Sequence, residues 1–79
     1  MSSVEETLKE ALTYMFLRIE MAPLWAPLFP EIRSVFREPW LGRDHYIGRL
    51  AEVILANHTE QEVVVTLAKF RLEGKWKPE

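Results

Sequence analysis

A four-residue unit of alanine, proline, leucine and an aromatic residue occurs twice in tandem, at residues 22–25 and 26–29, and Pro30 follows directly. Proline fixes φ and lacks the backbone N–H group, so it interrupts regular helices and central strands. We expect residues 22–30 to form an irregular connector and the helix before them to end ahead of Pro23. The aromatic side chains of the connector either fold back onto a small core or form a surface for a partner.

The small size of the chain limits how it can be stabilised. Its 79 residues suffice for a single domain, residues 1–79, and they include no cysteine for a disulfide. Because 48% of the residues are hydrophobic, we expect stability to come from packed helices or from association. The acidic start does not resemble a signal peptide, and no apolar run approaches the roughly 20 residues of a membrane span. We therefore expect a cytoplasmic protein that makes no membrane contact.

Apolar residues recur at helical spacing along most of the chain, and helix-capping residues precede several of these runs. Ser3 begins a capping box, Pro30 suits the first turn of a helix, and Asp44 is expected to be an N-cap. We predict an all-α fold, a small four-helix arrangement in which the last two helices form an antiparallel pair. The expected helices are at about 3–20, 30–38, 44–57 and 60–73.

The last of these segments carries two conflicting signals. A capping box begins at Thr59 and Gly74 suits the position after a helix, which together predict a helix between them. Against this, residues 63–65 are three β-branched valines, and polar and apolar residues alternate from 68 to 77 as in a strand. The alternative is therefore an α+β fold with a C-terminal strand or hairpin within residues 46–76.

The function that the sequence favours is a small protein–protein interaction module: an accessory subunit, an adaptor or an inhibitor. Large aromatic residues dominate the energetics of protein interfaces, and arginine adds a planar fork of hydrogen-bond donors. The segment 60–73 is also apolar around more than half of its circumference, which indicates self-association or docking. We expect no small-molecule substrate, cofactor or metal. The candidate partner-binding residues are Trp25, Phe29, Trp40 and Phe70 as apolar anchors, with Arg33, Arg37 and Arg43 supplying charge.

A nucleic-acid-binding regulator is the alternative function. Its basic residues would come from the stretch between Arg33 and Arg49 and from the tail around Lys75 and Lys77. The net charge of −2 argues against it, because the chain as a whole repels phosphate. We expect no enzymatic activity, because the sequence lacks a glycine-rich phosphate loop and a recognisable nucleophile motif.

Overall fold

The computed structural model describes residues 3–35 and 42–78, and within these ranges the chain is all-α and contains no strand. The predicted fold class is confirmed, and the alternative with a C-terminal strand is not supported. Within the same ranges, no helix is both long and apolar enough to cross a membrane. The helical elements are α1 (Ser3–Leu17), the 3₁₀ helix η1 (Ile19–Met21), α2 (Ala22–Trp25), α3 (Glu31–Val35), α4 (Arg43–Asn57) and α5 (Glu60–Leu72).

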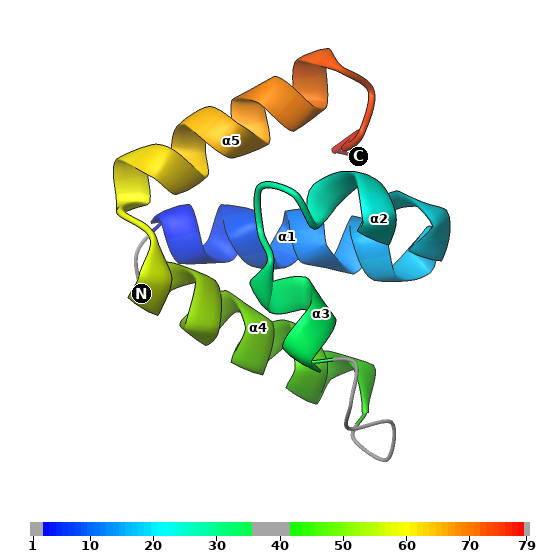
Figure 1. The fold of residues 1–79 in the computed structure, drawn as a ribbon, viewed down its shortest axis with the longest axis vertical. Helices are drawn as coiled ribbons and strands as arrows, with labels where there is room; N and C mark the ends of the chain where they lie inside the picture. Colours follow the sequence, from blue (N-terminus) through cyan, green and yellow to red (C-terminus); the bar gives the residue numbers. More distant parts are fainter. Residues whose placement is uncertain (1–2, 36–41, 79) are drawn as a thin grey trace.

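Helix α1 is the centre of the molecule. Figure 1 shows α5 and α4 on opposite sides of it, and α3 packs across α4. The expected antiparallel pairing of α4 with α5 is therefore wrong: the two helices meet at their shared corner and then diverge. The corner residues His58 and Thr59 both have extended backbone angles, and this turn lets each helix lay its apolar side against α1.

The proline segment is more helical than the sequence predicted. Ala22, expected to be non-helical because it precedes Pro23, has φ −55° and ψ −45° and begins α2. Pro23 lies in the first turn of α2, where its missing N–H group would have no helical partner in any case. Helix α1 ends at Leu17, before the expected residue 20, because Arg18 leaves the helical region at φ −128° and ψ 73°.

The other helix ends also depart from prediction at single residues. Helix α4 begins at Arg43 with Gly42 as its N-cap, so Asp44, the expected cap, lies inside the first turn. There its carboxylate interacts favourably with the positive end of the helix dipole. Helix α3 begins at Glu31, one residue later than expected, and its predicted end at 38 lies outside the described residues.

Local hydrogen bonds define both ends of α5, as the capping signals predicted. The Thr59 hydroxyl accepts a hydrogen bond of 3.1 Å from the Glu62 N–H group. At the other end Gly74 has φ +76°, its N–H group donates to the Arg71 carbonyl, and the Lys75 N–H group donates to the Phe70 carbonyl at 2.8 Å. This is the Schellman arrangement, in which a left-handed residue satisfies the last helical carbonyls.

The core is a single cluster to which α1, α2, α4 and α5 all contribute. Its α1 members recur at spacings of three and four residues, so they line one side of that helix. The largest fully buried side chains are Trp25, Phe29, Phe70, Leu8, Leu12, Met15, Ile32, Leu50, Ile54 and Val63.

Candidate functional site

Three of the four aromatic residues expected to anchor a partner lie inside the core. Trp25 and Phe70 are fully buried and Phe29 is 1% exposed. The Trp25 and Phe70 ring centroids are 4.7 Å apart, and Phe29 meets the Phe70 ring edge-on at 5.8 Å. Because a buried side chain has no surface to offer, the first of our two interpretations of the connector holds: its aromatic residues close the core.

A hydrogen bond between distant parts of the chain fixes this aromatic cluster. The Trp25 Nε1–H group donates to the Lys75 carbonyl at 2.9 Å, fifty residues away in sequence. It satisfies the one polar atom of the buried indole and ties the C-terminal segment to α2. Trp76, the next residue, is 6% exposed and also belongs to the core.

The two tandem units place equivalent residues on the same side of the chain. The Phe29 N–H group donates to the Trp25 carbonyl at 2.9 Å, and the Ala26 N–H group donates to the Ala22 carbonyl at 3.0 Å. These bonds span four residues, the length of the unit, so both aromatic side chains point inward. Both leucines, Leu24 and Leu28, stay exposed to solvent. With Leu17 at the end of α1 and Ile19 in η1, they are a first group of exposed apolar side chains.

The remaining candidates divide between exposed residues and residues outside the described ranges. Arg33 on α3 and Arg43 on α4 are exposed, and the Arg43 guanidinium lies 3.9 Å from the Asp44 carboxylate, itself in solvent. Such an exposed pair adds little to stability. Arg37 and Trp40 lie outside the described residues. Arg33 and Arg43 are therefore the two candidate arginines that the structure describes, and both lie on the surface. Among the described residues, no exposed aromatic residue lies beside them.

The second group of exposed apolar side chains lies on α5, opposite the side that faces the core. Val63, Leu67 and Phe70 are buried. Leu72 is 89% exposed, Val65 55% and Val64 46%, and Ala68 is also exposed. At 100° per residue, these four exposed residues and Gln61 occupy one strip along the helix. We call this strip, Gln61, Val64, Val65, Ala68 and Leu72, the outer face of α5.

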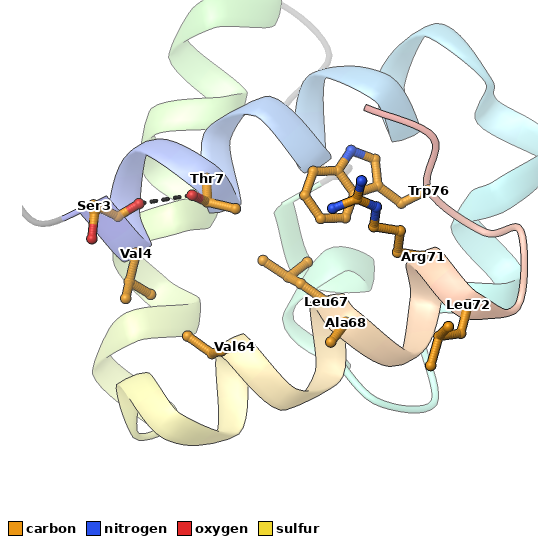
Figure 2. A pocket seen from close by; sticks show the side chains of 9 residues that line it. All are labelled: Ser3, Val4, Thr7, Val64, Leu67, Ala68, Arg71, Leu72 and Trp76. Carbon is orange, nitrogen blue, oxygen red and sulfur yellow. Dashed lines mark hydrogen bonds between the residues drawn. The ribbon is translucent and has the colours of Figure 1, made fainter. Parts of the chain in front are cut away.

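A groove runs beside the outer face, between α5 and the first turns of α1. Its volume is about 800 Å³ and it is mainly apolar, with Ser3, Thr7 and Arg71 contributing polar atoms at its walls. Figure 2 shows Val4 of α1 and Val64 of α5 at one end of the groove and Trp76 at the other. Its α5 wall shares Val64, Ala68 and Leu72 with the outer face, so the groove and the outer face form one continuous surface.

His58 lies between two glutamates at the corner between α4 and α5, and it joins this corner to α3. His58 Nε2 lies 2.8 Å from the Glu31 carboxylate of α3, and Nδ1 lies 3.4 Å from the Glu62 carboxylate of α5. The Phe29 ring packs edge-on against the imidazole at 5.5 Å. No sequence pattern indicates the contact between Glu31 and His58, because the two residues are 27 positions apart. Among the described residues, no group of three His, Cys, Asp or Glu side chains could hold a metal ion.

Comparisons of the chain with models of protein families, with curated proteins and with solved structures found no match. The chain's own surface therefore carries the indications of its function. That surface offers an apolar helix face with an adjoining groove on α5, a group of exposed leucine and isoleucine residues near α2, and exposed arginines on α3 and α4.

Proposed function

We propose that the chain is a small cytoplasmic protein–protein interaction module whose binding surface is the outer face of α5 with the adjoining groove. This keeps the interaction class that the sequence favoured and moves the surface away from the buried aromatic residues. The module would act as an accessory subunit, an adaptor or an inhibitor.

The observation that carries the proposal is the exposure of Val64, Val65 and Leu72 on a helix that already buries its other side. A surface helix usually places polar residues opposite its core stripe, and a helix that is apolar on both sides is usually covered on both. Each Å² of apolar surface removed from water contributes about 25 cal/mol, so covering this face is favourable. Contiguous apolar patches on soluble proteins commonly mark binding sites.

The geometry of the groove supports the same surface. A partner that contacts the outer face also meets Val4 and Thr7 of α1 across the groove, and it can form hydrogen bonds with the exposed Arg71. An interface with an apolar centre and polar groups at its edge is typical of specific protein complexes. The first group of exposed apolar side chains contributes only Leu17 to a smaller groove of about 370 Å³, so we rank that group second.

The test is affinity purification of the tagged chain after chemical cross-linking in its native cells, which also retains weak complexes, with quantitative mass spectrometry of the proteins recovered. Val65→Glu places a charge in the outer face, and Leu24→Glu places the same charge in the rival group, at a similarly exposed position. We expect the Val65→Glu variant to lose a stoichiometric partner that the wild type and Leu24→Glu retain. Loss with Leu24→Glu alone would transfer the binding surface to the α2 region.

Salt dependence separates this function from nucleic-acid binding. An apolar protein interface changes little as salt rises, whereas a complex that depends on phosphate contacts weakens steeply. We expect the partner to remain bound at about 0.5 M salt, well above the ionic strength that screens exposed charges. A complex that dissociates there and contains nucleic acid would favour the basic stretch and tail instead.

A further inference from the structure

Helix α5 carries its charges in an order that a second copy of the same helix can complement. Its first turn contains Glu60 and Glu62, and its last turn contains Lys69 and Arg71. Two such helices repel one another when parallel, because like charges lie side by side. In an antiparallel pair, the acidic end of each helix meets the basic end of the other, and opposite charges across an interface fix its orientation.

The charges also flank the outer face of α5 symmetrically. At 100° per residue, Glu62 and Lys69 lie along one edge of the face, and Glu60 and Arg71 lie along the other. All four side chains are exposed. Each edge thus holds one acid near the start of the helix and one base near its end, which is the pattern that an antiparallel copy would match on both edges.

An antiparallel pair of identical helices is related by a twofold axis. The charged edges and the apolar strip place this axis at nearly the same residue. Glu62 with Lys69, and Glu60 with Arg71, are both centred between residues 65 and 66. Three apolar residues of the strip and the polar Gln61 follow coiled-coil spacing. The pairs Gln61 with Leu72 and Val65 with Ala68 are both centred between residues 66 and 67. One twofold axis near residue 66 therefore satisfies the charges and the apolar contacts together to within one residue.

From this self-complementarity we infer that the occupant of the outer face is α5 of a second copy of this chain, packed antiparallel about a twofold axis. Such an interface uses the same surface of both copies, and each contact occurs twice. The small side chain of Ala68, opposite Val65, lets the two helices approach closely. This inference rests on the proposed function, because it names the partner of the surface described there.

The length of α5 sets the expected strength of the pair. Its 13 residues span about 20 Å, and an interface of standard size covers about 800 Å² on each partner. A helix pair of this length falls short of that area unless the α1 wall of the groove also contributes. We therefore expect a dimer that dissociates on dilution, with Kd on the order of 10 µM.

Sedimentation equilibrium of the purified chain tests the pairing. We expect the mass to rise from the 9.3 kDa of the monomer toward twice that value between about 1 µM and 1 mM. Val65→Glu should raise Kd about 100-fold, because the symmetric contact buries the new charge twice. Leu24→Glu should leave Kd unchanged. A wild type that stays at 9.3 kDa up to about 1 mM overturns the inference, whatever the variants do.

Disulfide cross-linking tests the orientation, since the chain contains no cysteine and each introduced thiol reports one position. In the antiparallel pair, residue 72 faces residue 61 of the other copy, and the two copies of residue 72 lie about 16 Å apart. Disulfides need Cα atoms within about 7 Å. We expect a mixture of Gln61→Cys and Leu72→Cys to form a cross-linked dimer on oxidation and Leu72→Cys alone to form none. The reverse result would contradict antiparallel pairing.

Circular dichroism of each variant confirms that it is folded before its mass is interpreted. The results also separate this inference from the proposed function. If the chain stays monomeric but a different protein is still lost from the Val65→Glu variant, self-pairing is wrong and the binding surface stands. If the chain is monomeric and Val65→Glu retains every partner of the wild type, both are wrong.

Discussion

Replacing Trp25 with alanine should lower the free energy of unfolding by about 3–5 kcal/mol, the range measured for buried tryptophan and phenylalanine. The side chain is fully buried, stacks on Phe70 and donates its N–H group to the Lys75 carbonyl. A 79-residue domain has a total stability of roughly 4–12 kcal/mol. The loss is therefore large enough to leave a substantial part of the protein unfolded at 37 °C.

Trp25→Phe separates the contributions of the indole. Phenylalanine keeps the contact with Phe70 but loses the hydrogen bond and part of the ring, so we expect a loss of about 1–2 kcal/mol and a Tm lower by about 5–15 °C. Leu24→Ala, at the exposed neighbouring residue, should change stability by less than about 0.5 kcal/mol. Urea and thermal unfolding followed by far-UV circular dichroism measure all three variants. If Trp25→Ala were no more destabilising than Leu24→Ala, the buried position of the tryptophan would be wrong.

Three further sets of substitutions test local features of the fold by thermal unfolding. Alanine variants of His58 and Glu31, combined in a double-mutant cycle, should show a coupling energy of about 1–2 kcal/mol, and additive effects would mean that the 2.8 Å contact does not form. Gly74→Ala should destabilise by about 1 kcal/mol because φ is +76°, whereas Gly48→Ala in α4, with open space around it, should stabilise by about 0.5 kcal/mol; equal effects would contradict the left-handed turn. Thr59→Ala should cost about 1 kcal/mol through loss of the N-cap, and Thr59→Ser should retain most of it.

The ends of α5 could be predicted from sequence because they depend on neighbouring residues alone. Thr59 and Gly74 fulfil their roles through hydrogen bonds and a φ angle within a few residues of themselves. The alternation that suggested a strand was misleading. A strand would have placed Phe70 and Leu72 on one face, but in the helix they lie about 200° apart, so one is buried and the other is the most exposed of the large apolar side chains described.

The four-residue repeat of the connector indicates that its aromatic side chains point the same way. The prolines made a helical segment look unfavourable and so obscured this pattern. A repeat of four residues is close to one helical turn, so Trp25 and Phe29 share a side wherever the segment is helical. The sequence predicts that Pro23 interrupts the helix, whereas at the first turn of α2 proline is tolerated. Which side faces the core depends on α5 and on the return of the chain at Lys75, and neither contact has a local signal.

Aromatic residue type did not locate the candidate surface, whereas the excess of apolar residues on α5 did. Tryptophan and phenylalanine are frequent both in interfaces and in cores, so residue type alone could not place Trp25 or Phe70. The excess of apolar residues on α5 was the more informative signal, because one helix side cannot bury Val63 and Val65 at once. The contact between His58 and Glu31 had no sequence signal, since it depends on how α3 packs against the corner of α4 and α5.

Methyl NMR of the chain at increasing concentration tests the central claim, that the outer face of α5 is the binding surface and pairs with its own copy. The methyl groups of Val64, Val65 and Leu72 should shift together as the dimer forms, while those of Leu24 and Leu28 keep their positions. Shifts confined to Leu24 and Leu28, or a spectrum that does not change between about 10 µM and 1 mM, would contradict the account.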